Sequence, residues 1–555
     1  MSSPLIQEVE TRHSPESLIA RLHSSPGTIL LRSGTMEHSD RFSLVAARPF
    51  LRFESFGSRC IIRSATGKRT LFGNPWKLLE SLANRYELLE EIDLPFPLGG
   101  CFGYFGYELK QFVEPRLPLT ALKDLELPEC SVGFYDSLVV FDHQLGKVWL
   151  ISTGLDEEGD RCPKRTQAAI EFWTEHLAAL GQAETTAAAL GQAEAHSITS
   201  TLSRAEYCAG VRRIIDYIWQ GDIYQANLTH RLAMATNLDG WSLYQRLATA
   251  SPAPFSAFMQ CGDFQLASSS PEQFLQLSGS QVTTRPIKGT RPRGATPDLD
   301  ARLGYELQSS EKERAELVMI TDLLRNDLGR FCEYGSVTVP DLAKLERFAQ
   351  VQHLVSTVTG RLRPGVTHLQ ALASSFPGGS ITGAPKIRAM EIIDELEPVV
   401  RGPYTGCLGY LGFNRESQLN ILIRTAILAQ QPPTSKDRHP RTGTHDLDAL
   451  VEFECALPRV RTSDEESGAC LCPLHGLGEG VLRVYLIHVC AQARAKRCVQ
   501  TCCSRSFGAD TNTLLLAIIR SDARSDITFS VRMTRWACGS RDITIMSPRS
   551  SCTRQ

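Results

Sequence analysis

A carboxylate and an amine occur at the ends of neighbouring predicted strands. Glu272 stands in Ser270-Pro271-Glu272, and Lys288 follows sixteen residues later in the segment 286–293, PIKGTRPR. A glutamate can act as a general acid or base. A lysine that burial or its neighbours hold neutral can act as a nucleophile. Taken alone, the two residues would equally suit an exposed surface. A catalytic interpretation of them therefore depends on the other motifs of the chain.

A third carboxylate lies in a charged segment with helical spacing. Residues 311–328, EKERAELVMITDLLRNDL, place Leu317, Ile320 and Leu324 on one side, which predicts an amphipathic helix. Glu316 on this helix offers the oxygen ligands that Mg²⁺ prefers. An exposed, solvated helix face would show the same pattern.

A glycine-rich turn feeds the start of another predicted helix. Residues 376–386 read FPGGSITGAPK, and the helix is expected to begin at Ala384-Pro385. A helix start presents free backbone N–H groups and a positive dipole end, which suit a carboxylate or a phosphate. The segment lacks the GxxxxGK[ST] pattern of a phosphate-binding P-loop. His353 lies among apolar residues, where a hydrogen-bonded core histidine is the usual interpretation.

The elements that must position these residues are of two kinds. Residues 1–150 contain short β-branched and aromatic segments bounded by turn residues, which predict strands. From residue 201 onward, long amphipathic segments alternate with strand-like ones. One of them, 203–220, begins at a capping Ser203 and ends at Gly221. Long helices mixed with antiparallel-looking strands favour an α+β fold.

Composition excludes several classes of protein. The chain has 555 residues, a net charge of −2 and 42% hydrophobic residues, so it can bury a large core. The near-neutral charge argues against a nucleic-acid or membrane-surface binder. No apolar run reaches the 18 residues of a membrane span, and the N-terminus does not resemble a signal peptide. We therefore expect a cytoplasmic protein.

Taken together, the motifs resemble the chorismate-utilising enzymes, such as anthranilate synthase component I and aminodeoxychorismate synthase component I. From residue 201 onward the segments that carry the resemblance are SPEQF, PIKGTRPR, ERAELVMITDLLRND, HLVSTVTG, FPGGSITGAPKIRAMEIIDELEP and RGPYTGCLGYLGF. The N-terminal half adds LLRSG, RFSLVAARP and PLGGCFGYFGYEL, and GDIYQANLTHR stands near the junction. The resemblance implies an α+β fold with a two-layer antiparallel β-sheet core flanked by helices.

Lys288 distinguishes between two kinds of enzyme in this family. Anthranilate synthases carry a small residue at this place, whereas the aminodeoxychorismate synthases that form a covalent intermediate carry lysine. The resemblance thus implies amination of chorismate to 4-amino-4-deoxychorismate, with Glu272 as the acid, Lys288 as the nucleophile and Glu316 as a ligand of Mg²⁺. The positions that match substrate-binding residues of the family are Gly289, Thr290, His353, Thr382, Gly383, Ala384, Tyr404 and Arg424. Lys386 is a weaker candidate for a carboxylate contact.

The resemblance also implies a second ligand and a partner. The residues that match the family's tryptophan pocket are Ser33, Arg41, Phe42, Pro254, Phe255 and Ser256. Side chains of the protein itself could fill that pocket instead. The chain has no GxCxGxQ segment of a glutaminase, so a separate glutamine amidotransferase subunit is expected to supply ammonia. Anthranilate synthase component I, or an inactive protein that binds tryptophan or the partner, remain the alternative interpretations.

The resemblance ends near residue 430. We predict an N-terminal region at 1–175, an Ala/Gln-rich linker at 176–200, a chorismate-binding region at 201–430 and an aberrant tail at 431–555. The tail carries nine of the 17 cysteines, and its 15 Arg against 2 Lys depart from the rest of the chain. A shifted reading frame is our preferred explanation, and a real appended module is the alternative. We expect the loss of the family's last strand and second metal carboxylate to leave apolar surface unpaired and activity low.

Overall fold

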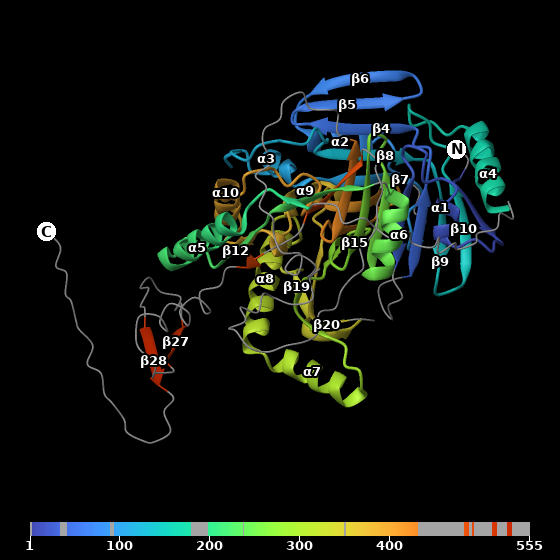
Figure 1. Cartoon of the computed structure of the whole chain (residues 1–555). Coiled ribbons are helices and arrows are strands. Elements are labelled where there is room, and N and C mark those ends of the chain that lie inside the picture. Colours follow the sequence, from blue (N-terminus) through green and yellow to red (C-terminus); the bar gives the residue numbers. More distant parts are fainter. Residues whose placement is uncertain are drawn as a thin grey trace. The chain divides into compact units, whose positions relative to one another are not determined.

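The computed structural model describes residues 3–33, 41–88, 94–178, 198–236, 238–348 and 351–430, and four short strands between 482 and 535. The chain divides into two compact units, Met1–Ala493 and Arg494–Gln555. The second unit contains the antiparallel pair β27 (Thr513–Ile518) and β28 (Ser530–Arg535). Figure 1 shows the elements of both units.

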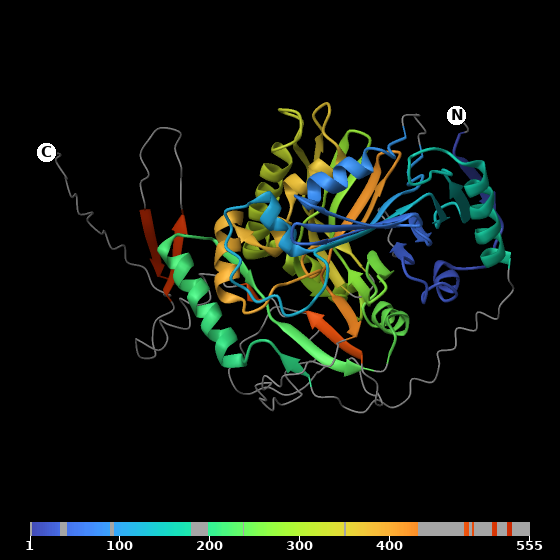
Figure 2. The ribbon, with the colours of Figure 1, turned by 90° about the horizontal axis from the view of Figure 1, so that it is seen from above.

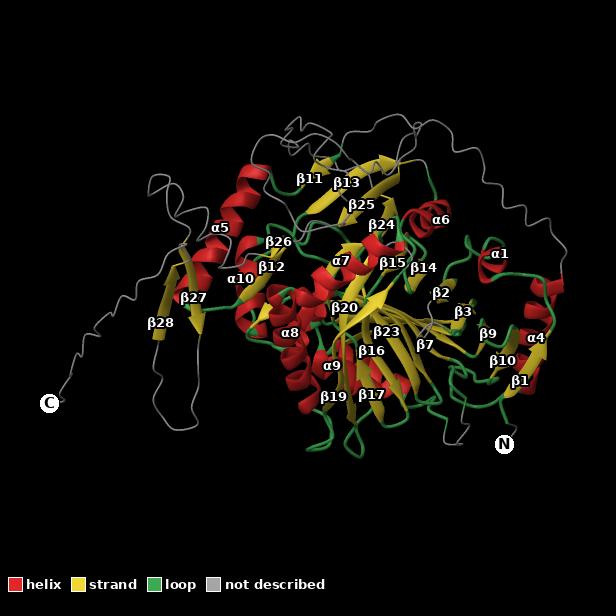
Figure 3. Ribbon diagram, turned by 90° about the horizontal axis from the view of Figure 1, so that it is seen from below, coloured by secondary structure: helices red, strands yellow, loops and turns green. Residues whose placement is uncertain are grey.

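The first unit is built on two large antiparallel sheets. Figure 3 shows the strands of the first sheet, which has eleven strands. Its order is β1 (Leu5–Val9), β10 (Lys147–Ser152), β9 (Ser137–Asp142), β3 (Phe42–Ala46), β2 (Ile29–Ser33), β14 (Phe255–Gln260), β15 (Phe264–Ser270), β24 (Thr425–Gln430), β25 (Leu482–Ile487), β13 (Arg231–Thr236) and β11 (Thr199–Ser200).

The second sheet has twelve strands. Its order is β18 (Ile287–Pro292), β20 (Val351–Arg361), β17 (Gln281–Thr284), β16 (Gln273–Ser278), β23 (Glu416–Ile421), β22 (Cys407–Gly412), β7 (Gly100–Phe105), β8 (Cys130–Tyr135), β4 (Leu51–Phe56), β5 (Arg59–Ser64) and β6 (Gly67–Phe72), with β19 (Thr338–Arg347) also paired to β20. A small third sheet joins β21 (Gly383–Ala384), β12 (Gln225–Leu228) and β26 (Ala491–Gln492).

The main core lies between the two large sheets. Leu44 and Leu266 of the first sheet belong to the same buried cluster as Phe53 and Tyr104 of the second. Burial of this much apolar surface is the dominant favourable contribution to folding. The predicted two-layer antiparallel core is therefore confirmed.

Helices cover the outer sides of this core. The helices α1 (Pro15–Ile19), α4 (Pro163–Ala178) and α6 (Gly240–Ala250) pack on the first sheet. The helices α7 (Pro297–Ser309) and α8 (Glu311–Gly329) pack on β18 and β20, and α2 (Pro75–Ala83) contacts α9 (His368–Ser375). The helices α5 (Arg204–Gln220) and α10 (Lys386–Leu396) pack on β12. Figure 2 shows α5, in green, beside α10, in orange. The single turns η1 (Tyr107–Leu109), α3 (Lys110–Val113) and η2 (Gly379–Ile381) complete the described helical elements.

The predicted linker does not separate two independent sheets. Most of the segment 176–200 lies outside the described residues, but each large sheet contains strands from both sides of it, because β2 pairs with β14 in the first sheet and β7 pairs with β22 in the second. The tail also differs from expectation. The edge of β24 that we expected to be unpaired is paired with β25, which in turn pairs with β13. The rest of the predicted aberrant tail, apart from the four short strands, lies outside the described residues.

Candidate active site

Lys288 and His353 lie on adjacent strands. Lys288 on β18 is opposite Leu354 on β20, and Thr290 is opposite His353, with a bulge between the two positions. The Thr290 Oγ1 and the His353 Nδ1 are 2.9 Å apart. Gly289 in the bulge has a φ of 76°, a conformation that glycine adopts without strain. The bulge thus places Lys288 next to the Thr290–His353 pair along β18.

The helix α8 connects this bulge with the glycine-rich turn. A Cβ on Gly289 would lie 3.1 Å from Cβ of Glu313, and a Cβ on Gly379 would lie 2.5 Å from Cδ2 of Leu323. Both glycines therefore allow α8 to approach closely. Glu316 comes three residues after Glu313, so it lies on the same side of the helix. Glu316 is half-buried, and along α8 it stands between Glu313, which lies beside the bulge, and Leu323, which lies beside the glycine-rich turn.

The donor set suits Mg²⁺ only in part. Among the described residues, no three His, Cys, Asp or Glu side chains gather as a metal site. Magnesium is often held by one or two carboxylates, with water and substrate oxygens completing its shell. Glu316 fits the role of one such carboxylate, and the second carboxylate that the family resemblance implies has no match in the described residues.

The backbones of Glu272 and Arg424 are both bonded at the end of β15. The carbonyl of Glu272 accepts a hydrogen bond from the Ile421 N–H at 3.0 Å, and the Ser269 N–H donates to the Arg424 carbonyl at 3.0 Å. The Glu272 side chain is buried, with 8% exposed. The guanidinium of Arg424 reaches Ser251 Oγ at 3.4 Å. The segment 421–425 thus brings the predicted acid and one predicted substrate contact together.

Tyr404 joins the same region through its neighbour. Tyr404 is buried, and the Thr405 N–H donates to the Leu422 carbonyl at 2.8 Å. Leu422 directly follows Ile421, whose N–H binds the Glu272 carbonyl. This backbone bond therefore places Tyr404 near the segment that contacts Glu272.

The glycine-rich turn is held by strand pairing. Ala384 and Gly383 pair with Gln225 and Ala226 of β12. A Cβ on Gly383 would lie 2.1 Å from the Gln225 carbonyl oxygen, so only glycine permits this approach. The hydroxyl of the buried Thr382 donates to the Gly378 carbonyl at 3.0 Å, inside the turn. Strand pairing and hydrogen bonds thus hold the turn, which suits a site that binds through backbone groups.

Lys386 has a structural role rather than the carboxylate contact considered from the sequence. Its ammonium lies 2.6 Å from Oδ2 of Asp327 and donates to the carbonyls of Ser375 and Pro377 at 3.1 and 3.0 Å. An ammonium has three donors, and these partners use all of them.

The residues of the predicted tryptophan pocket also gather. Phe255 on β14 is opposite Ser33 on β2, and Phe42 begins the neighbouring strand β3. Pro254 and Ser256 flank Phe255 and are buried. The guanidinium of Arg41 binds the Asp142 carboxylate at 2.6 Å and lies over the Phe42 ring. The interaction with Arg41 favours the charged Asp142, whose pKa is lowered despite the opposing effect of burial.

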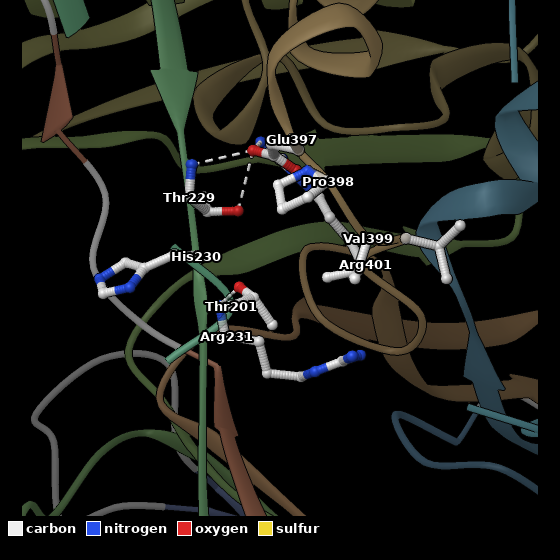
Figure 4. A pocket seen from close by; sticks show the side chains of 9 residues that line it. Thr201, Thr229, His230, Arg231, Glu397, Pro398, Val399 and Arg401 are labelled. Atoms are coloured by element: carbon white, nitrogen blue, oxygen red, sulfur yellow. Dashed lines mark hydrogen bonds and ion pairs between the residues drawn. The ribbon is translucent and has the colours of Figure 1, made fainter. Parts of the chain in front are cut away.

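Two cavities are lined by other residues. One, of about 10 Å³, lies beside Thr229, Glu397 and Arg401 (Figure 4). The other, of about 550 Å³, opens near the end of α8 and includes Asp322 and Tyr334 in its lining. Sequence reasoning missed Glu397 and Arg401, which lie just beyond the end of α10, so the i, i+4 pattern of a helical ion pair does not single them out.

Comparison with known proteins identifies the family. The profile of the chorismate binding enzymes matches residues 32–435. The chain belongs to the chorismate binding enzyme family. It is 40% identical to aminodeoxychorismate synthase component 1 of Klebsiella aerogenes over 433 residues, which cover 77% of this chain and 91% of that protein. It is 38% identical to anthranilate synthase component 1 of Acetivibrio thermocellus, with 77% and 87% of the two chains covered.

A solved structure supports the same fold for this family member. Anthranilate synthase component I of Streptococcus pneumoniae matches with a TM-score of 0.62 and 29% identity, over 70% of this chain and 85% of that one. The two kinds of enzyme are thus about equally similar to this chain. Among the described residues, no helix is long and apolar enough to span a membrane.

Proposed function

We propose that this chorismate binding enzyme is an aminodeoxychorismate synthase component, which replaces the C4 hydroxyl of chorismate by an amino group. The observation that supports this choice is Lys288, a primary amine on the β18 bulge beside the Thr290–His353 pair. A lysine held within a site can act as a nucleophile, and a small apolar residue there could not.

The proposed reaction has two stages. In the first, the neutral Lys288 amine adds to C2 of chorismate while Glu272 protonates the C4 hydroxyl, which leaves as water. In the second, ammonia adds to C4 and expels the lysine amine from C2, which restores free Lys288. The sum is chorismate plus ammonia giving 4-amino-4-deoxychorismate plus water.

The other residues bind and orient the substrate in this proposal. The backbone of Gly383 and Ala384, the Thr290 hydroxyl and the Arg424 guanidinium offer donors to carboxylates. His353 and Tyr404 border the ring. Glu316 would hold Mg²⁺, which when bound neutralises a substrate carboxylate and polarises the ring. We propose that ammonia comes from a separate glutamine amidotransferase subunit.

The covalent stage gives a direct experiment. The full chain is incubated with chorismate and Mg²⁺ in the absence of ammonia, and its intact mass is measured. We expect an increase equal to chorismate less one water, located on the peptide that contains Lys288 and absent from Lys288→Ala. Addition of ammonium should release 4-amino-4-deoxychorismate. Fluorescent anthranilate with pyruvate, and no adduct, would instead show the alternative, an anthranilate synthase.

The departure from the family beyond residue 430 bears on the rate. We expect slow turnover, because the described residues supply one of the two carboxylates expected for Mg²⁺. Rapid magnesium-dependent turnover would contradict this expectation and leave the proposed reaction intact. If chorismate neither binds nor reacts, while tryptophan raises the melting temperature, the alternative of an inactive protein that binds tryptophan would be favoured.

A further inference from the structure

A buried arginine lies behind the glycine-rich turn. Arg401 is 3% exposed, and its guanidinium contacts three separate segments of the chain. It donates to the Ile381 carbonyl at 3.1 Å and to the Asn227 carbonyl at 2.7 Å. It also pairs with both carboxylate oxygens of Glu397, at 2.9 and 2.7 Å. Five N–H donors in one plane make these simultaneous contacts possible.

Asn227 extends this contact to the turn itself. Its side-chain amide donates to the Ser380 carbonyl at 2.8 Å, and its backbone N–H donates to the Thr382 carbonyl at 2.9 Å. Together with the bond from Arg401 to Ile381, three successive carbonyls of the turn are held from one side. These carbonyls directly precede Gly383 and Ala384.

Glu397 keeps the guanidinium in place. Its Oε1 also accepts hydrogen bonds from the backbone N–H and the hydroxyl of Thr229, at 2.8 and 2.9 Å (Figure 4). The Glu108 carboxylate in turn accepts hydrogen bonds from the backbone N–H groups of Arg401 and Gly402, both at 2.9 Å. The cavity beside this cluster is about 10 Å³, room for no more than one water molecule. This cavity is therefore too small for a substrate, and the side chains of the cluster contact only other parts of the protein.

The same arginine reaches toward Tyr404. Its guanidinium donates to Thr405 Oγ1 at 3.3 Å, and the Thr405 hydroxyl donates to the Tyr404 carbonyl at 2.6 Å. One planar group thus contacts the backbone of the turn directly and that of Tyr404 through the Thr405 hydroxyl.

We propose that Arg401, with Asn227, is a positioning residue that holds the 380–384 turn and the Tyr404 segment in the geometry that binds chorismate. The inference rests on the proposed function for its ligand, and on the contacts above for its mechanism. Loss of the planar set of guanidinium donors should let the Gly383 and Ala384 amides move. Small displacements of binding groups have large effects on reaction rates.

The test uses the full chain and Arg401→Lys. Lysine keeps the charge beside Glu397, but its single ammonium cannot reach both carbonyls and the carboxylate at once. Lys110→Met is the matched control. Lys110 is fully buried and pairs with Asp394, ten residues after Ala384, and within the described part of the chain its ammonium makes no hydrogen bond with the 380–384 turn. Both variants should lower the melting temperature.

Two readouts separate positioning from general loosening. In Arg401→Lys, amide hydrogen exchange in 380–384 and 225–228 should accelerate about tenfold, and the chorismate dissociation constant should rise about tenfold. In Lys110→Met both should stay within about twofold of wild type once stability is matched with denaturant. Unchanged exchange in Arg401→Lys, or equal changes in both variants, would overturn the inference.

A second variant decides if Arg401→Lys does not fold. Asn227→Leu is close in size and removes the amide that donates to Ser380 and accepts from the Gln225 side chain at 3.4 Å, so it should accelerate exchange in the turn in the same way. Normal exchange in Asn227→Leu would overturn the inference. Failure of the wild-type chain to bind chorismate would refute the proposed function instead, and the exchange measurement would still decide the role of Arg401.

Discussion

The ammonium of Lys386 lies 2.6 Å from Oδ2 of Asp327, and this pair joins the end of α8 to the start of α10. Both side chains are nearly buried, with 10% and 4% exposed. Burial raises the pKa of Asp327, and Lys386 opposes that effect. Because α8 carries Glu316 and α10 follows the glycine-rich turn, the pair fixes two parts of the candidate site relative to each other.

We predict that Lys386→Met destabilises the protein by about 3–5 kcal/mol, because it leaves the Asp327 carboxylate buried without its cation. The double variant Lys386→Met/Asp327→Leu should recover most of this loss, since it removes the uncompensated charge as well. Denaturant unfolding of the first unit measures both. Equal destabilisation by the single and double variants would show that the packing of the lysine, and not its charge, is what matters.

The bulge that carries Lys288 should depend on glycine at position 289. Alanine there would adopt a φ of 76° and would place its Cβ 2.8 Å from Cδ1 of Leu307. We expect a loss of about 2–4 kcal/mol from strain and overpacking together, and a loss of chorismate binding as β18 shifts.

Gly335→Ala is the control for this prediction. Gly335 has a similar φ of 80°, but nothing lies within 4 Å of the position of its Cβ. It should cost about 1 kcal/mol from the backbone conformation alone. Equal costs at the two positions, measured by thermal and denaturant unfolding, would mean that α7 yields and that the close contact is unimportant.

Local signals in the sequence predicted local structure. Ser203 and Glu206 form the capping box of α5, and Gly221 ends that helix with a φ of 84°. These features depend on residues a few positions apart, so a sequence pattern contains them. The family motifs likewise singled out Glu272, Lys288 and the glycine-rich turn as candidates, and their roles stay predictions.

Contacts between distant segments could not be predicted in the same way. Arg401 contacts Asn227, which is 174 positions away, and no local pattern at either residue shows this bond. The pairing of β25 with β24 was also missed, because an amphipathic period does not fix which strands a segment will join. In both cases tertiary packing decides, and only the folded chain reveals it.

The stability of the first unit should depend on the protonation of His368. The pKa of this buried histidine is lowered to about 4, because burial disfavours its charged form. Its Nε2 lies 2.9 Å from the Gly279 carbonyl and must donate, so Nδ1 accepts from the Ser417 hydroxyl at 2.8 Å. The folded state therefore favours the neutral ring.

The sign of the pH effect follows from this pKa. Between about pH 6.5 and pH 4 the unfolded chain binds more protons than the folded chain, so the free energy of unfolding falls as the pH is lowered. The stabilising effect of His368 relative to His368→Gln should shrink by about 3 kcal/mol from pH 7 to pH 4. Denaturant unfolding at several pH values measures it. Parallel pH profiles of the two proteins would contradict the buried neutral histidine.

The strand β25 should be essential to the first unit, although it lies in the segment that departs from the family. It forms six residue pairs with β13 and five with β24, so it is a central strand of the first sheet. Without it, β24 and β13 would lose this partner, and exposed strand edges promote aggregation. Proline is excluded from such a position because it cannot donate to the ladder.

We therefore predict that Val484→Pro lowers the free energy of unfolding of the first unit by about 3 kcal/mol or more and increases aggregation. Leu515→Pro is the matched control, because it interrupts β27 in the second unit and leaves both large sheets untouched. Its first unit should unfold as in wild type, as followed by hydrogen exchange in β24. If Val484→Pro and Leu515→Pro leave β24 equally protected, β25 does not complete the sheet, and the tail after residue 430 contributes nothing to the fold of the enzyme.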